Sequence, residues 1–370
     1  MGSELLLYGY GAVCLSMLVF NIVYNISQKR KDQRLERKSR RLETRVDRQI
    51  ARLREGEPLE RGHTAYLCRK LSHVGSLIVF DRMMAERLEE EEDWGVGEYR
   101  RQIQPVILHL AVVYRDRDDM QAAYFAYFLS RHKLKRHMAM DSIQYILVEY
   151  MDKESLYCRV NALQALYEFG SPEHVADAIT ALDQSGRFFH DKILTDGLLS
   201  FTGSHDQLIH LLLDRFSSFT TQTKLAVLNY IRFRSGDYCE WILAIMTGPG
   251  EDKELRLSAI RYAGKYIYPP AKPVLLAFAS DKNPLNWEYA SISASALANY
   301  EGEDVLDALM VAIYSSNWYV RGSAAASLEA HGLDYSDLMA VVGGGDRYVR
   351  EMMLYQLDLR RMRAESQAAV

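Results

Sequence analysis

From Thr64 onward, apolar residues recur along the chain at alternating spacings of three and four. This spacing places apolar side chains on one face of a helix, whereas a half-buried strand needs alternation at every second residue. Residues 67–88 and 106–116 follow the helical spacing, and strand-like alternation is absent. The acidic run from Glu89 to Asp93 predicts a loop between helices. The pattern therefore predicts an all-α fold.

A nine-residue stretch recurs in the rest of the chain. Its copies begin at Cys158, Asp191, Thr223, Leu255, Tyr289, Val320 and Val349, at separations of 33, 32, 32, 34, 31 and 29 residues, and a weaker copy begins near Asp118. A turn and a second apolar helix follow each copy, as where Ser171 and Pro172 form a helix start. Because one helix pair cannot bury its apolar face alone, the sequence predicts an α-solenoid of about seven to eight stacked pairs.

Two of these copies carry a resemblance to a known family. Asn317 and Asp346 are each followed, three residues later, by Val-Arg and then by a Leu at the end of the stretch. This pattern resembles the HEAT repeat and is most similar to the short bacterial form also found in phycobilin lyases. The resemblance covers residues 118–357 and implies a solenoid that supplies binding surfaces, with Asp252, Asn317 and Asp346 pairing with a ladder of Arg side chains. Tetratricopeptide repeats have a similar period, but their Trp, Leu-Gly and Tyr pattern does not recur.

The first part of the chain has a different character. No charged side chain occurs from Leu5 to Ile26. A helix of this length reaches about 33 Å, enough to cross a bilayer core of about 30 Å. Residues 1–27 are therefore interpreted as a transmembrane anchor, in preference to a buried helix of a soluble protein. A cleaved signal peptide fits less well, because the charged residue before the apolar run is Glu4.

A basic segment follows, with 12 Lys and Arg against 4 Asp and Glu in residues 29–54. Basic flanks stay in the cytoplasm, so the N-terminus is expected outside a bacterial inner membrane and the solenoid inside. Residues 28–62 are expected to form a solvated helix at the membrane surface and a linker, the alternative being a short coiled coil. Residues 63–117 then form a helical cap, and residues 118–370 the solenoid. Candidate contacts to anionic lipid are Lys29, Arg30, Lys31, Arg34, Arg37, Lys38, Arg40 and Arg41.

The net charge and the spacing of the Cys and His residues exclude several classes of function. The net charge is −4, and 33 basic against 44 acidic residues follow Arg54, which argues against a nucleic-acid partner. The four Cys form no C-x-x-C pair. His132 and His137 are five residues apart, as are His205 and His210, whereas helical metal ligands lie three or four apart. The sequence predicts no catalytic residue, no metal and no cofactor.

Aromatic residues recur in the turns before the first helix of the repeats. They are Tyr157, Phe188, Phe189, Phe219, Trp287, Trp318, Tyr319 and Tyr348. Two interpretations remain open: the rings fill gaps between repeats, or they form an exposed ridge that binds a partner. The candidate partner-binding residues are Phe188, Phe189, Trp287, Trp318, Tyr319 and Tyr348.

These features together predict a bacterial, membrane-anchored HEAT-repeat protein. Its expected function is that of a non-catalytic scaffold or regulatory subunit that holds a protein partner at the cytoplasmic membrane face. A membrane glycosyltransferase of a polysaccharide synthase complex is the preferred example. The alternative is a HEAT-like lyase or another small-molecule-binding enzyme.

Overall fold

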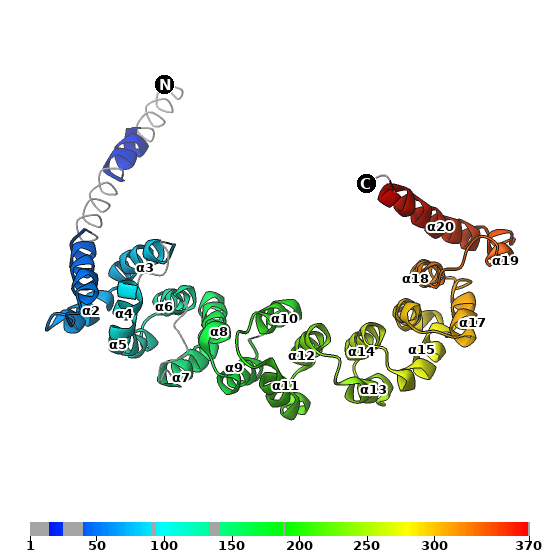
Figure 1. Ribbon diagram of the computed structural model, residues 1–370, viewed down its shortest axis with the longest axis horizontal. Coiled ribbons are helices and arrows are strands. Elements are labelled where there is room, and N and C mark those ends of the chain that lie inside the picture. The colour runs from blue at the N-terminus through cyan, green and yellow to red at the C-terminus, as the bar shows by residue number, and fades with distance from the viewer. Residues whose placement is uncertain (1–14, 25–39, 90–93, 133–140, 188, 369–370) are drawn as a thin grey trace, which may run out of the picture. The chain divides into compact units, whose positions relative to one another are not determined.

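The computed structural model describes residues 15–24, 40–89, 94–132, 141–187 and 189–368, and these residues form helices joined by turns, without a strand (Figure 1). The chain divides into two compact units. The first runs to Ser185 and includes Phe201–Leu208, and the second comprises Gly186–Ser200 and the chain from Ile209 onward. The all-helical architecture is that of an α-solenoid, as the helical spacing of apolar residues predicts.

The first unit has two layers of helices. Its helices are α2 (His63–Leu71), α3 (Val74–Glu89), α4 (Trp94–Gln102), α5 (Gln104–Arg115), α6 (Asp119–Arg131), α7 (Asp141–Glu149), α8 (Leu156–Phe169) and α9 (Pro172–Gln184). Helices α3, α6 and α8 pack side by side in one layer, and α5, α7 and α9 in the other. Ser171 caps α9 by accepting a hydrogen bond from the His174 amide, and Pro172 occupies the first turn, which confirms the predicted helix start.

A further helix, residues 40–54, precedes α2 and belongs to this unit's core. Its apolar face is buried: Leu42, Val46, Ile50 and Leu53 are almost fully inaccessible to solvent. The guanidinium of Arg45 lies 4.1 Å from the ring centre of Tyr66 on α2. The expectation of a solvated helix is therefore wrong. The apolar residues recur over the whole length of this helix, so one of its sides packs against the unit. The exposed side carries Arg40 and Arg41.

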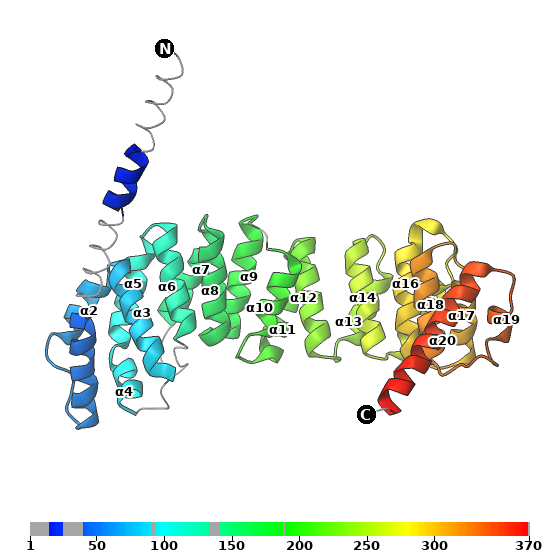
Figure 2. The same cartoon turned by 90° about the horizontal axis from the view of Figure 1, so that it is seen from above.

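The second unit repeats the paired arrangement. It contains α10 (Asp191–Leu199), α12 (Thr221–Arg234), α13 (Cys239–Thr247), α14 (Lys253–Lys265), α15 (Lys272–Ala279), α16 (Trp287–Ala296), α17 (Glu303–Ala312), α18 (Trp318–Ala330), α19 (Met339–Val342) and α20 (Arg347–Ala368), while α11 (His205–Asp214) has residues in both units. Helices α12, α14, α16 and α18 pack in chain order (Figure 2), and α13, α15 and α17 pack against them in a second layer (Figure 1). These helices start at or near the predicted copies of the repeat.

Two tyrosines bridge successive repeats in the second unit, each through a hydroxyl that donates one hydrogen bond and accepts another. The Tyr262 hydroxyl donates to the Ser235 carbonyl at 3.0 Å and accepts from the Tyr238 amide at 3.1 Å. The Tyr300 hydroxyl, which follows the first helix of the next repeat, donates to the Ala263 carbonyl at 2.9 Å and accepts from the Tyr268 amide at 3.2 Å. A side chain at Gly264 would lie 2.9 Å from the Ala296 Cβ, so α14 and α16 approach closely only because this residue is glycine. The register of each repeat is thereby fixed by its neighbour.

The predicted membrane location is wrong. Within the described part of the chain, no helix is long and apolar enough to cross a membrane. Of the predicted span, residues 15–24 form a described helix, which at about 1.5 Å per residue covers about 15 Å, half of a bilayer core. The remaining residues of the span lie outside the described residues, as do Lys29, Arg30, Lys31, Arg34, Arg37 and Lys38.

Candidate partner-binding site

The starts of α18 and α20 hold their aromatic rings in equivalent positions. The Asn317 side chain accepts a hydrogen bond from the Tyr319 amide at 2.9 Å, and the Asp346 carboxylate accepts one from the Tyr348 amide at 2.9 Å. Each side chain therefore caps the first turn of its helix, where backbone amides lack partners within the helix. The cap fixes the direction in which the following aromatic side chains leave the backbone.

The repeated arginines of this chain also stabilise the turn before the helix. Arg321 donates to the Ser315 carbonyl at 2.8 Å, and Arg350 donates to the Gly344 carbonyl at 3.2 Å. Both bonds reach back six residues and close the turn before the helix. The pairing of Asp or Asn with a ladder of Arg, which the family resemblance implies, is not the arrangement here. Instead, the acidic or amide side chain caps the helix and the arginine binds the carbonyls of the preceding turn.

Three rings from neighbouring repeats form an aromatic cluster, which we define as Trp287, Trp318 and Tyr319. The rings of Trp287 and Tyr319 are stacked across the repeat boundary, with their centres 5.2 Å apart and their planes inclined by 27°. Trp318 meets Tyr319 edge to face, again at 5.2 Å. Trp318 and Tyr319 keep 60% and 58% of their surface exposed, and Trp287 is half-buried. The cluster is thus ordered by mutual contact while its outer surface faces solvent.

Polar contacts flank the cluster on both sides. The Lys253 ammonium pairs with the Glu288 carboxylate next to Trp287. The Arg321 guanidinium lies 5.5 Å from the ring centre of Tyr348, which is itself exposed. The rings of α16, α18 and α20 therefore continue along one edge of the second unit, bordered by a cation at one end of the row and an ion pair at the other.

A groove of about 450 Å³ opens beside the aromatic cluster. It lies between the turn that precedes α16 and the turn that precedes α18, and Trp287, Tyr314 and Asn317 are among its lining residues. Asp281 and Lys282 bring charges of both signs to its rim. Polar and apolar atoms line the groove in similar shares, so it can accept a short segment that offers groups of both kinds.

The predicted aromatic residues divide into buried and exposed ones, and the helix cap explains the division. Phe189 and Phe219 are each only 4% exposed, and each comes directly before a cap residue, His190 or Thr220. A side chain in that position turns back toward the helix it precedes. The exposed rings follow the cap as the first or second helical residue: they are Trp318, Tyr319, Tyr348 and, in the first unit, Tyr157. Trp287 also comes first in its helix and is half-buried. Phe188 lies outside the described residues.

The aromatic pattern alone missed two apolar residues at the same edge. Leu285 is the most exposed large apolar residue of the described chain, and it lies in the short 3₁₀ turn Pro284–Asn286 before α16. Tyr314 is half-exposed and follows α17 at the groove. A Leu placed between Pro and Asn in a turn, where no core position is expected, is a sequence signal that could have found the first of them.

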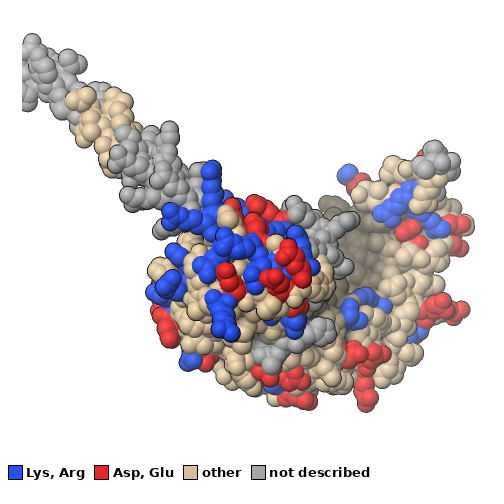
Figure 3. Space-filling view, turned by 60° about the vertical axis from the view of Figure 1, so that its left-hand side comes forward, with Lys and Arg blue, Asp and Glu red and all other residues tan. Residues whose placement is uncertain are grey.

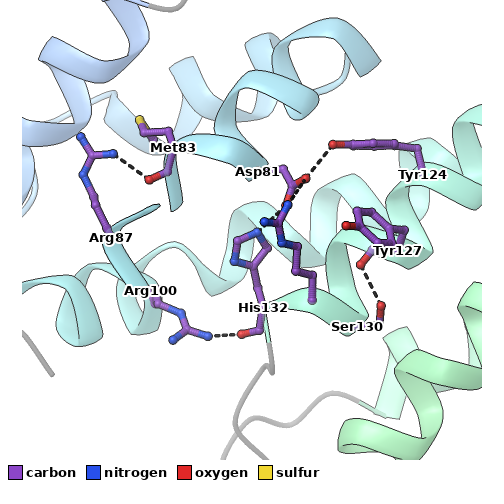
Figure 4. A network of polar contacts seen from close by, with 9 residues as sticks. Asp81, Met83, Arg87, Arg100, Tyr124, Tyr127, Ser130 and His132 are labelled. Atoms are coloured by element: carbon purple, nitrogen blue, oxygen red, sulfur yellow. Dashed lines mark hydrogen bonds and ion pairs between the residues drawn. The ribbon is translucent and has the colours of Figure 1, made fainter. Parts of the chain in front are cut away.

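A polar network in the first unit is the strongest alternative to the aromatic site (Figure 4). The Asp81 carboxylate on α3 contacts His132 Nε2 at 2.7 Å, accepts a hydrogen bond from the Tyr124 hydroxyl at 2.7 Å and faces Arg131 at 3.4 Å. Burial alone would raise the pKa of Asp81, but the hydrogen bonds from His132 and Tyr124 hold it below its usual value. Asp81 and His132 are both 3% exposed and form a buried pair that joins α3 to the end of α6, whereas Arg131 at the edge of the network is exposed to solvent.

Neither this network nor any other described group suits a metal. Within the described ranges, no three His, Cys, Asp or Glu side chains are arranged to hold an ion. His205 and His210 lie at separate aromatic contacts, with Phe201 and with Tyr238, and His137 lies outside the described residues. The described histidines therefore have structural surroundings rather than ligand geometry.

Comparison with known proteins identifies the repeat. The sequence family described as HEAT repeats matches residues 239–329, the segment from α13 to the last turn of α18. Both the match and the paired helices support a HEAT-repeat protein. No curated protein matches the chain. The matched HEAT repeats include Trp287, Trp318 and Tyr319, so the aromatic cluster lies in the part of the chain with the clearest family pattern.

Proposed function

We propose that this protein is a non-catalytic scaffold that binds a protein partner through the aromatic cluster and the groove beside it. HEAT repeats commonly mediate protein–protein interactions. The observation that carries the proposal is the stacking of Trp287 on Tyr319 across two repeats while Trp318 and Tyr319 stay more than half exposed. Trp and Tyr are the residue types most enriched among the side chains that dominate binding energy.

The geometry of the cluster favours binding in a second way. Because the rings already pack on one another, they lose little rotational freedom when a partner covers them. Their open faces can take an apolar side chain or a guanidinium group, which aromatic rings attract. The groove of about 450 Å³ can accept the neighbouring residues of the same peptide segment. The partner predicted by this chemistry is an extended peptide segment that carries apolar or Arg side chains.

The preferred partner from the sequence, a membrane glycosyltransferase, depended on the membrane location. Because that location is wrong, we infer the partner from the chemistry of the aromatic cluster and the groove. This chemistry fits a peptide segment and does not indicate a class of membrane enzyme. The same correction removes anionic lipid as the expected contact of the basic segment. Of the candidate lipid contacts, Arg40 and Arg41 are described, and both are exposed.

The test is partner binding by a variant that lacks the two exposed rings. Trp318→Ala/Tyr319→Ala should weaken binding by about thirtyfold, which corresponds to about 2 kcal/mol. Tyr355→Ala is the matched control, because Tyr355 lies in the same unit and is also 58% exposed but is remote from the cluster in sequence. Proteins captured by wild type and by Tyr355→Ala, and lost from the double variant, are the partners that the proposal requires. Equal capture by all the variants would refute it.

A further inference from the structure

A second pocket lies in the first unit, away from the residues used above. It has a volume of about 500 Å³ and is formed by the helix of residues 40–54, by α2 and by the start of α3. Arg41, Arg69, Lys70 and His73 line it together with an apolar wall that includes Leu42 and Tyr66. Its lining contains no Asp or Glu among the described residues. The pocket is thus a concave surface with basic groups at its rim and apolar atoms at its back.

The cations of this pocket lack the partners that neighbouring cations have. In the same unit, Arg87 pairs with Asp47, Arg52 with Glu57 at 2.9 Å and Arg101 with Glu98. Arg41, Arg69 and Lys70 make no ion pair with the described residues and are exposed.

The sequence explains why the positive charges of Arg69 and Lys70 are not neutralised locally. No acidic residue occurs from Arg61 to Phe80, which covers α2, the turn after it and the first half of α3. Figure 3 shows many Lys and Arg side chains on the face of the N-terminal helices, with Asp and Glu side chains among them. Three unpaired cations that converge on one concavity raise the local concentration of anions, since their fields add where low-dielectric walls surround them.

The shape of the groups favours phosphate among the anions. The guanidinium groups of Arg41 and Arg69 can each present two parallel N–H donors to a phosphate, and Lys70 adds a compact charge. Helix α3 begins at the pocket with Val74, so the positive end of its dipole faces the same space. A Cβ atom at Gly75 would have no neighbour within 4 Å, so the backbone there is open to close approach.

We propose that this pocket binds the phosphate groups of a small phosphorylated molecule. The apolar wall formed by Leu42, Tyr66 and Val79 would cover the organic part of the ligand, while the cations at the rim hold the phosphates. Binding of this kind is independent of the aromatic cluster, which lies in the other unit. It gives the scaffold a small-molecule site besides its protein-binding edge.

The experiment measures the binding of ATP, inorganic pyrophosphate and adenosine to the full chain by isothermal titration calorimetry. ATP and pyrophosphate should bind, more weakly as salt rises, and adenosine should not. ATP binding tighter than that of pyrophosphate identifies an organic phosphate as the ligand class, and equal binding identifies free polyphosphate. Failure of both to bind, or binding of adenosine as tight as that of ATP, overturns the proposal.

Paired variants locate the site. Arg69→Gln/Lys70→Gln should weaken ATP binding at least tenfold, which is about 1.4 kcal/mol. Arg48→Gln/Arg61→Gln changes the net charge equally, and both of its residues are exposed in the same unit but do not line the pocket. The control should bind ATP as wild type does. If the two double variants weaken ATP binding equally, the attraction is general and the pocket is not the site. Unchanged melting temperatures of the two variants show that both remain folded.

Discussion

Two single substitutions distinguish aromatic rings that stabilise the fold from rings that bind a partner. One replaces a ring that precedes a helix cap, and the other replaces a ring that follows one. Phe219 precedes the cap of α12 and is 4% exposed, whereas Trp318 follows the cap of α18 and is 60% exposed. Phe219→Ala removes a fully buried ring and leaves a cavity. Trp318→Ala removes a ring that buries less than half of its surface and touches Tyr319 edge to face.

The expected losses of stability follow from these burials. Truncation of a buried Phe costs about 3–5 kcal/mol, so Phe219→Ala should lower the free energy of unfolding of the second unit by that amount. The partial burial of Trp318 scales the same cost to about 1–2 kcal/mol. Urea unfolding followed by far-ultraviolet circular dichroism measures both losses, and hydrogen exchange of peptides from α12 and α18 shows which helices lose protection.

Binding must then rank the two variants in the opposite order. Trp318→Ala should reduce partner capture under conditions where both proteins are folded, and Phe219→Ala should leave capture unchanged. A loss of stability in Trp318→Ala as large as that in Phe219→Ala would refute the reasoning. Trp318 would then be a ring that fills a gap between repeats, and the helix cap would not decide which rings are available to a partner.

Two further predictions concern the first unit. Leu53→Ala should lower its free energy of unfolding by about 2–5 kcal/mol because Leu53 is buried, whereas Arg48→Ala on the exposed side of the same helix should change it by less than about 0.5 kcal/mol; equal urea midpoints would contradict this. Burial, with a smaller effect of Arg45, lowers the pKa of His63 from 6.5 to about 4. An unfolded His binds its proton near pH 6.5 and the folded one only near pH 4, so stability should be full above pH 6.5 and fall by up to about 3 kcal/mol as the pH drops to 4. His63→Gln should abolish this part of the pH dependence of the urea midpoint, and a persistent dependence would assign it to another group.

The repeat itself was open to prediction because each copy carries its own signals. The helical spacing of apolar residues, the Ser171–Pro172 start of α9 and the recurring nine-residue stretch all act within one or two helices. Local signals of this kind can be interpreted without knowing which helices pack together, since every helix of a solenoid contacts the same type of neighbour. The Val-Arg stretch at Val320 accordingly marks α18, a helix within the matched HEAT repeats.

The N-terminal helix shows why the remainder was harder to predict. The spacing of Leu42, Val46 and Leu53 was visible in the sequence, but the many Lys and Arg around it favoured a solvated helix. Long basic side chains can lie along the exposed face of a helix whose other face is fully buried, so net charge says little about burial. The structure shows this division, with Val46 inaccessible and Arg48 exposed on one helix. The number of charged residues therefore indicates that one face of the helix is exposed, but it does not indicate whether the other face is buried.

The aromatic edge shows a second limit, which is one of register. Phe219 and Trp318 both fall in the turn before a repeat's first helix, so a pattern of residue types treats them alike. Their surroundings differ because the N-cap position of α12, Thr220, comes after Phe219, whereas the N-cap residue of α18, Asn317, comes before Trp318. A shift of one or two residues relative to the cap moves a ring from the core to the surface. Asn and Asp are strong cap residues, so an aromatic residue that directly follows one, as Trp318 follows Asn317, is expected at the surface of such a repeat, and one that precedes the cap is expected in the core.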